Sequence, residues 1–315
     1  MKQLIKNEIK DILRFWLDKG VEGFRVDAPM LFFEDEELRD NRPMTGDVTA
    51  FSNIFSQFER CFHHPDTYRY LNELNVFLRD YDRTSGKSTR TPLIGETYGD
   101  IQTVIKYFGT RRFPAFHLPL NYLMTDNMTT YLNSRELHDF LHTWLNQVPK
   151  GVASSWALGN YDQGRISYRL NAEYNYILLA LVTMLPGACQ VYYGEELNMG
   201  RNNLVREKDP FNRVFHRTPM QWDDSRNAGF STGDKTWLPV HPNYWNTNVQ
   251  SQEPDQNSNL NYFKDLMAIR RTQTMKYGDL KFHVMSDWVL AFSRTFKQTM
   301  LHYFNEFGTG NSTHR

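Results

Sequence analysis

Three carboxylates stand where the sequence could perform acid–base or nucleophilic chemistry. Asp27 comes directly after the apolar letters FRV, Glu96 after LIG, and Asp162 after LGNY. In retaining glycosidases one carboxylate attacks the anomeric carbon and a second, about 5–5.5 Å away, protonates the leaving oxygen. Crowded carboxylates also raise one pKa, which keeps that acid protonated near neutral pH. Taken singly, each residue is more often a turn residue or a helix cap, so the hypothesis depends on all three meeting.

The elements that must position these carboxylates alternate between helix and strand. Apolar residues recur at helical spacing in the first helix, which ends at Lys19-Gly20. Ser134 is expected to cap the helix that it begins. The remaining helices are expected over residues 70–81, 101–108, 172–185 and 260–271. The strands are expected over residues 21–28, 91–95, 113–120, 155–159 and 189–193.

This alternation predicts a parallel sheet with crossover helices, as in an α/β barrel. In such a barrel the carboxyl ends of the strands form the active-site face. Asp27 and Glu96 end neighbouring strands in this order, and one further strand separates Glu96 from Asp162. The three carboxylates are therefore expected to line one arc of the same opening.

The pattern changes near residue 277. The segments 280–285, 289–296 and 299–304 are rich in strand-forming residues, with no helical pattern between them. We therefore expect residues 1–276 to form part of a barrel and residues 277–315 to begin an all-β domain.

Composition narrows the class of partner. Lys and Arg number 36 and Asp and Glu also number 36, so the formal net charge of zero disfavours a nucleic-acid surface. The longest apolar stretch, residues 176–185, is too short to span a bilayer, and the first twenty residues do not resemble a signal peptide. Two cysteines make neither a disulfide framework nor a metal cluster. A neutral small molecule is the partner that fits, with no nucleic acid and no membrane segment in this chain.

The ordered segments GFRVDA (23–28), IGET (94–97) and GNYDQGR (159–165) resemble three signature segments of the α-amylase family of glycoside hydrolases. The later segments VYYGEEL (191–197), RTPMQWD (217–223), NAGFS (227–231) and TWLP (236–239) resemble its maltase branch, the animal α-glucosidases in particular. The resemblance covers essentially the whole chain, and the ordered set is far more specific than any one segment.

The resemblance implies a role for each matching residue. Asp27 would be the nucleophile, Glu96 the general acid/base, and Asp162 the residue that stabilises the oxocarbenium-like transition state. Arg25 would orient Asp27, and Arg165 would contact the terminal glucose or pair with an acid near it. Ala28 is the small residue typical of sites that favour α-1,4 over α-1,6 linkages.

Alternatives stay open for several of these residues. Arg25 could form a purely structural salt bridge, and Arg165 could be a surface residue at a helix start. For Trp222 and Trp237 plain core packing is preferred over sugar stacking. Tyr161 stands where the family carries His; it can donate a hydrogen bond but cannot carry a positive charge.

The same resemblance implies that the chain holds about strands 4 to 8 of a (β/α)8 TIM barrel and the start of the C-terminal β-domain. No cofactor or metal ligand is expected here, and the ligands of any Ca²⁺ would lie upstream. Such a segment, incomplete at both ends, could be inactive by itself.

The implied activity is that of a retaining, maltase-like α-glucosidase acting on maltose and short maltooligosaccharides. The host protein is expected to be secreted or anchored on the outer face of a membrane. Two alternatives remain: the non-catalytic heavy chain of an amino-acid transporter, which has the same fold, and a pseudoenzyme. Survival of all three carboxylates favours the enzyme.

Overall fold

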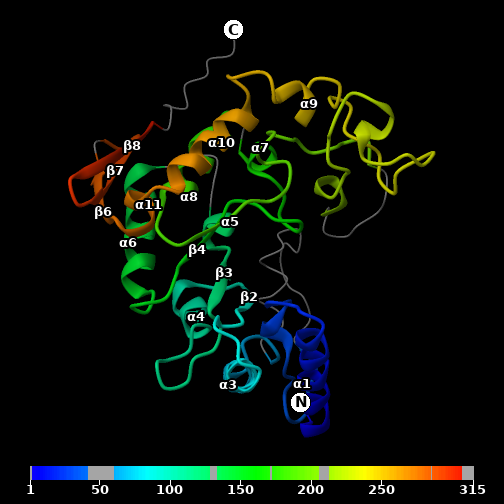
Figure 1. The fold of residues 1–315 in the computed structure, drawn as a ribbon, viewed down its shortest axis with the longest axis vertical. Helices are drawn as coiled ribbons and strands as arrows, with labels where there is room; N and C mark the ends of the chain where they lie inside the picture. The colour runs from blue at the N-terminus through cyan, green and yellow to red at the C-terminus, as the bar shows by residue number, and fades with distance from the viewer. Residues whose placement is uncertain are drawn as a thin grey trace. The chain divides into compact units, whose positions relative to one another are not determined.

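The computed structural model describes residues 2–41, 60–127, 133–170, 172–205, 213–284 and 286–306 (Figure 1). The chain divides into two compact units. The first unit comprises Met1–Asp126 and Trp144–Ser155, and the second comprises Asn127–Thr143 and Trp156–Arg315. Asp27 and Glu96 therefore belong to the first unit and Asp162 to the second.

A three-stranded parallel sheet lies at the centre of the first unit. Its strands are β1 (Phe24–Val26), β2 (Leu93–Thr97) and β3 (Leu118–Asn121), hydrogen-bonded in that order. The prediction that the strands before Asp27 and Glu96 are neighbours is confirmed. The register pairs Val26 with Gly95 and Glu96 with Leu120, so both carboxylates emerge at the carboxyl edge of this sheet.

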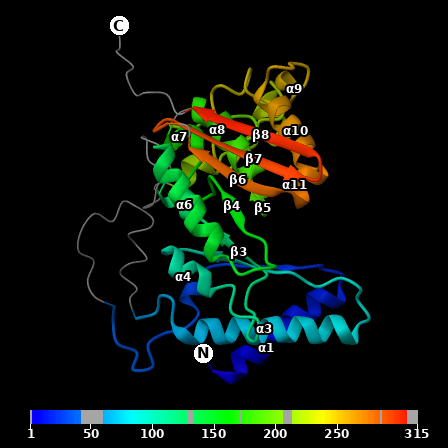
Figure 2. The ribbon, with the colours of Figure 1, turned by 90° about the vertical axis from the view of Figure 1, so that its left-hand side faces the viewer.

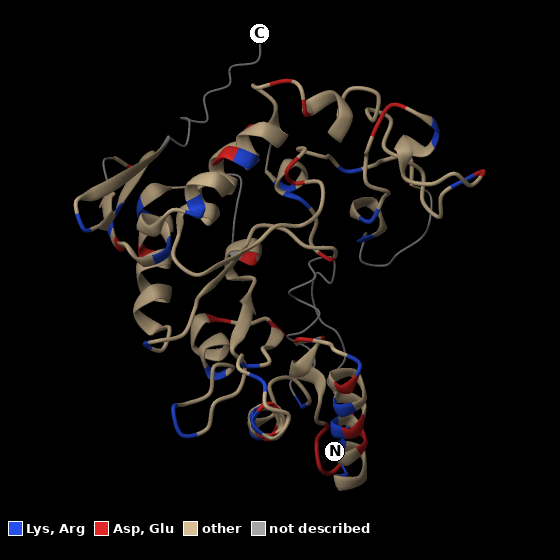
Figure 3. Ribbon diagram, in the orientation of Figure 1, with Lys and Arg blue, Asp and Glu red and all other residues tan. Residues whose placement is uncertain are grey.

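The helices of the first unit follow the predicted alternation. They are α1 (Gln3–Asp18), the short 3-10 helix η1 (Pro29–Leu31), α3 (Pro65–Thr84) and α4 (Ile101–Lys106). The helix expected over residues 70–81 is longer at both ends, and it begins early because the His64 side chain accepts a hydrogen bond from the Asp66 amide. Helix α1 is fastened to α3 by Lys6 with Glu73 (2.9 Å) and by Tyr81 with Asp18 (2.6 Å). Figure 3 shows residues of both charge signs along α1.

Helices α5 (Leu123–Asn127) and α6 (Ser134–Gln147) follow β3 in the chain. The prediction that Ser134 caps α6 was wrong. The Asn133 side-chain oxygen accepts from the Arg135 amide at 2.8 Å and takes the capping role, because an Asx oxygen reaches the first free N–H groups. The Ser134 hydroxyl instead donates to the Ser286 carbonyl.

Four of the predicted strands are longer than the observed ones, the first being residues 21–28, of which only 24–26 form β1. The strand expected from Phe113 begins only at Leu118, because the amides of Ala115 and Phe116 donate to the carbonyls of Phe108 and Tyr107, just after α4. Strand β4 is Ser155–Ala157 and β5 is Ala188–Gln190, and these two pair with each other. Between β3 and β4 the Ser155 hydroxyl accepts from the Asn121 amide and donates to the Pro119 carbonyl. The described strands thus form a sheet of three and a sheet of two rather than one five-stranded ladder.

Helix α8 (Ala172–Met184) begins with an exposed polar turn and is buried from Leu178 to its end. Its buried side chains include Leu178, Leu179, Leu181 and Val182. No helix in the described part of the chain is long and apolar enough to cross a membrane. The other helices of the unit are α7 (Ile166–Arg169), η2 (Arg213–His216), η3 (Arg226–Gly229), α9 (Val249–Gln252), α10 (Asn259–Arg270) and α11 (Gln273–Tyr277).

Three antiparallel strands follow α11, as the change of pattern near residue 277 predicts. They are β6 (Asp279–Val284), β7 (Val289–Phe296) and β8 (Thr299–Glu306), seen together in Figure 2. Arg294 on β7 is buried and donates to the carbonyls of Met184, Met275 and Gly278, which fastens this sheet to the ends of α8 and α11. A domain boundary at residue 277 stays a prediction, and residues 307–315 lie outside the described residues.

Gly95 is required by its position in β2. A methyl group there would lie 1.9 Å from the ring of Phe116. We expect Gly95→Ala to lower the free energy of unfolding by about 1–3 kcal/mol, as overpacked cores typically do. Urea unfolding of the purified protein measures this, with Gly200→Ala as the control, because the added methyl there meets nothing closer than 3.7 Å. Equal stability of Gly95→Ala and wild type would refute the close approach.

Candidate active site

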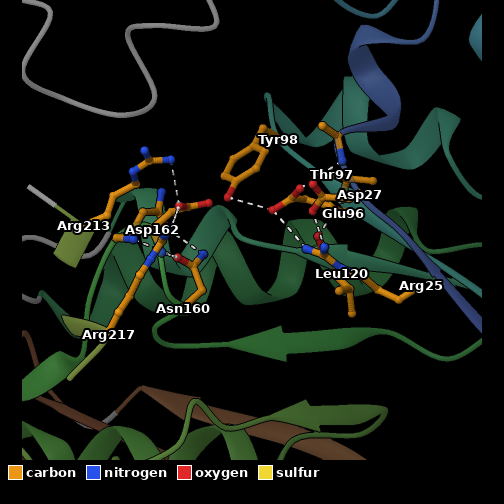
Figure 4. A network of polar contacts seen from close by, with 12 residues as sticks. Arg25, Asp27, Glu96, Thr97, Tyr98, Leu120, Asn160, Asp162, Arg213 and Arg217 are labelled. Atoms are coloured by element: carbon orange, nitrogen blue, oxygen red, sulfur yellow. Dashed lines mark hydrogen bonds and ion pairs between the residues drawn. The ribbon is translucent and has the colours of Figure 1, made fainter. Parts of the chain in front are cut away.

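Arg25 connects two carboxylates at the edge of the first unit's sheet. One terminal nitrogen contacts the Asp27 carboxylate, and the other lies 3.3 Å from Glu96 Oε1. Arg25 lies in β1, Asp27 directly follows β1, and Glu96 lies in β2. Strand pairing therefore places all three at one edge, where Figure 4 shows Arg25 directed at both acids. The structure brings Arg25, Asp27 and Glu96 together, as the resemblance implies.

The two carboxylates have different environments. The side chain of Asp27 is 68% exposed and that of Glu96 only 6% exposed. Burial raises the pKa of Glu96, and the Asp27 carboxylate raises it further. The Ala28 amide and the Arg25 charge act in the opposite direction and limit the rise. Burial thus lets Glu96 keep its proton to higher pH than an exposed glutamate would, which is how a general acid is prepared.

Ala28 holds Glu96 through its backbone. It adopts a left-handed conformation (φ 42°, ψ 44°), which is uncommon for a residue with a side chain. In that conformation its amide donates to Glu96 Oε2 at 3.1 Å, while the Tyr98 hydroxyl donates to Glu96 Oε1 at 3.2 Å. Both oxygens of Glu96 are therefore held, and part of that order depends on a strained residue next to Asp27.

Asp162 lies on a tight loop of the second unit. The side chain of Asn160 accepts from the amides of Asp162 and Gln163, both at 2.8 Å, which closes an Asx turn. The Gly164 amide returns to the Asn160 carbonyl at 3.0 Å. The loop therefore presents the Asp162 side chain, 9% exposed, in one orientation.

Arg217 fixes this loop and was not assigned a role from the sequence. Its Nη2 lies 2.6 Å from Asp162 Oδ1, and its Nε donates to the Tyr161 carbonyl at 3.0 Å. Its guanidinium also lies over the Tyr161 ring, 5.2 Å from the centroid. Arg213 adds a second cation 3.7 Å from Asp162 Oδ1. Two arginine charges therefore lie beside Asp162 (Figure 4).

Arg165 lies beneath the same loop and is fully buried. Its guanidinium lies near the rings of Tyr192 and Tyr193 (5.0 and 4.8 Å), and its Nε donates to the Tyr193 carbonyl at 2.9 Å. The alternative that Arg165 is a surface residue was wrong, because the two tyrosines cover it. Whether it contacts glucose stays a prediction, and in this structure it supports the loop from below.

Two further expectations from the sequence are corrected in the second unit. Trp222 is 49% exposed and Trp237 is 66% exposed, so the preference for core packing was wrong. Both side chains lie on irregular segments between residues 217 and 239, where no periodic pattern could show which way they face. Arg217 opens the same segment, RTPMQWD, so the signal that could have found it was already in the sequence.

The structure gathers the predicted site residues into two groups. Arg25, Asp27, Ala28 and Glu96 meet in the first unit, and Tyr161, Asp162 and Arg165 lie together in the second. That the two groups share one opening stays a prediction. Within the described residues, no group of three or more His, Cys, Asp or Glu side chains is arranged to hold a metal ion.

A parallel sheet with two coupled carboxylates at its carboxyl edge is the arrangement found in glycoside hydrolases built on an α/β barrel. The chain belongs to the α-amylase family: residues 1–278 match the family described as alpha amylase, catalytic domain. The catalytic domain of this family is a (β/α)8 barrel. That this chain carries strands 4 to 8 of it stays a prediction.

Known proteins similar to this chain include two different kinds of relative. Maltase A2 of Drosophila melanogaster is 30% identical over 305 residues, which cover 93% of this chain and 53% of that protein. The human protein "Amino acid transporter heavy chain SLC3A1" is 30% identical over 291 residues, which cover 90% of this chain and 42% of that protein. The chain therefore spans about half the length of the curated relatives that it matches.

Among solved structures, the alpha-glucosyl transfer enzyme XgtA superposes with a TM-score of 0.79 at 24% identity. The match covers 96% of this chain and 58% of that one. At this identity the likeness shows the fold.

Glu195 gives the second unit a pH dependence that can be measured. Its burial raises its pKa to about 7. The folded protein then binds more protons than the unfolded one from about pH 4.5 to pH 7, so stability falls as pH rises through this window. We expect Glu195→Gln, which cannot ionise, to remove part of that fall in urea unfolding measured at pH 5 and pH 8. The exposed Glu136→Gln serves as the control; an unchanged pH dependence in Glu195→Gln would contradict the buried, titrating carboxyl.

Proposed function

We propose that this chain carries the catalytic carboxylates of a retaining α-glucosidase that releases terminal α-1,4-linked glucose from maltose and short maltooligosaccharides. The observation that carries the proposal is the Arg25-bridged pair of Asp27 and Glu96, in which Glu96 is the buried acid with the raised pKa. The maltases among the relatives supply the substrate class.

The proposed double displacement gives each residue a role. Asp27, exposed and paired with Arg25, attacks the anomeric carbon while Glu96 donates its proton to the leaving oxygen. Glu96 then takes a proton from water, and that water releases glucose from Asp27 with retained configuration. Asp162, held by Arg217 and the Asn160 turn, stabilises the positive charge that develops on the sugar ring. Tyr161 and Arg165 complete the second group, and no cofactor or metal takes part.

The neighbours of Asp27 also bear on linkage choice. Ala28 places only a methyl group next to the nucleophile, which supports the preference for α-1,4 linkages that the family resemblance implies. From the family resemblance we place the whole protein outside the cell, secreted or anchored to the outer face of a membrane.

Replacement of Asp27 and replacement of Glu96 should have different effects on substrates with different leaving groups. With the protein purified from its natural reading frame, Asp27→Asn should lose maltose and α-glucosyl fluoride hydrolysis alike. Glu96→Gln should lose maltose hydrolysis by about 10²–10⁴-fold. It should still release fluoride in the first turnover, because fluoride leaves without a proton. Unchanged maltose hydrolysis in either variant would exclude the assignment.

The basic limb of the pH profile tests the electrostatics of Glu96. Because Glu96 must be protonated for the first step, kcat/KM should fall as pH rises past its raised pKa. Removing the Arg25 charge takes away an influence that lowers this pKa, so Arg25→Met should move the limb to higher pH. The exposed Arg83→Met is the matched control and should leave the limb in place. A limb that stays fixed in Arg25→Met would show that another group titrates.

The heavy chain of an amino-acid transporter is the second candidate, because one such protein matches this chain at 30% identity. A transmembrane helix encoded directly upstream and co-purification with a multi-span membrane protein would support it. A cleavable signal peptide upstream and glucose release from maltose would support the enzyme.

A further inference from the structure

Glu195 is a buried carboxyl to which the proposed mechanism gives no role. It lies at the end of the turn 192–195, shortly after β5, and is only 1% exposed. One oxygen, Oε2, accepts from the Tyr192 amide at 2.9 Å, and among the described residues Oε1 has no hydrogen-bond partner. Burial of a carboxyl that is so incompletely paired is costly, so its presence calls for a reason other than stability.

The Glu195 carboxyl lies against the loop that carries Asp162. That loop runs from Gly159 to Arg165, and a methyl group added to Gly159 would lie 2.4 Å from Glu195 Oε1. Burial raises the pKa of Glu195, and the charge of Arg165 lowers it, which places the guanidinium close by. Glu195 therefore adjoins the first and the last residue of the loop, and Asp162 lies between them.

Glu195 also closes the turn that covers Arg165. The Tyr192 amide donates to the Glu195 side chain, and the Glu195 amide donates back to the Tyr192 carbonyl at 3.0 Å. The turn holds Arg165 through the Tyr193 carbonyl, which accepts from Arg165 Nε at 2.9 Å, and through both tyrosine rings. Without the Glu195 acceptor, the Tyr192 amide loses its partner and the turn is free to move away from Arg165.

We propose that Glu195 is a positioning residue for Asp162, which it holds in place through the turn 192–195, Arg165 and the backbone of Gly159. The inference rests on the proposed function for the role of Asp162, which is to stabilise the charge on the sugar ring. Glu195 acts through its acceptor oxygen and its length rather than its negative charge, because Oε2 and the contact with Gly159 form the links to the loop.

Glu195→Met tests this role, because methionine is similar in length and removes the acceptor. With the protein from its natural reading frame, kcat for maltose should fall about ten- to hundredfold, as small misplacements at an active site do, while KM stays within about twofold. Glu195→Gln keeps an acceptor of the same length and should retain most of kcat. Val182→Ala is the control for general destabilisation: Val182 is fully buried on α8 in the same unit, and its truncation should lower stability but not kcat.

Hydrogen exchange of the loop separates this inference from the proposed function. The Asp162 and Gly164 amides are both bonded to Asn160, and in Glu195→Met they should exchange about tenfold faster than in wild type. Exchange should stay near the wild-type rate in Glu195→Gln and in Val182→Ala. This result would support the positioning role even in a protein that hydrolyses no glucoside.

Glu195→Asp is a second variant that keeps the charge but withdraws the acceptor by one methylene. It should resemble Glu195→Met in loop exchange and in kcat, and it serves if the methionine variant does not fold. Unchanged loop exchange in both variants would overturn the inference. So would equally fast exchange in Val182→Ala, or a loss of kcat in Glu195→Gln as large as that in Glu195→Met.

Discussion

The ion-pair bridge from Arg25 to Asp27 and Glu96 is the interaction on which the rest of the site depends. Two carboxylates at the ends of adjacent strands repel each other, and the strand spacing prevents them from moving apart. One arginine between them lowers that repulsion, while the burial of Glu96 leaves the two acids with unequal environments. That inequality is what allows neighbouring groups to serve as nucleophile and acid.

In the second group, around Asp162, a carboxylate is again paired with an arginine. Asp162 is nearly buried and is held by the Asn160 turn on one side and by Arg217 on the other. Arg165, Tyr192 and Tyr193 pack beneath the loop and support it. In both units a carboxylate is therefore positioned by an arginine and a backbone turn rather than by its own strand alone.

Much of this could be predicted from the sequence, because strand order alone brings Asp27 next to Glu96. The apolar runs before each carboxylate and the helical spacing between them carried that information. The extents of the strands could not be predicted so well, since the amides of Ala115 and Phe116 donate to the segment after α4 and the Ser155 hydroxyl bonds to β3 in place of a backbone ladder. The prediction that Ser134 caps α6 was wrong because Asn133, one residue earlier, accepts the hydrogen bond of the Arg135 amide.

Sequence periodicity could not predict the roles of Arg217, Trp222 and Trp237, for a different reason. They lie on irregular segments, where side-chain direction follows from loop packing and not from a repeat. The family resemblance included this segment, but only the folded structure shows that Arg217 contacts Asp162 and that the two tryptophans are exposed.

The central claim is that Asp27 forms a covalent bond to glucose. Incubation of the purified protein with 5-fluoro-α-D-glucosyl fluoride, followed by proteolysis and mass spectrometry, tests it most directly. We expect a glucosyl adduct on the peptide that contains Asp27, and fragmentation should place it on that carboxylate. An adduct on Glu96 or Asp162, or turnover of the reagent with no adduct at any carboxylate, would contradict it.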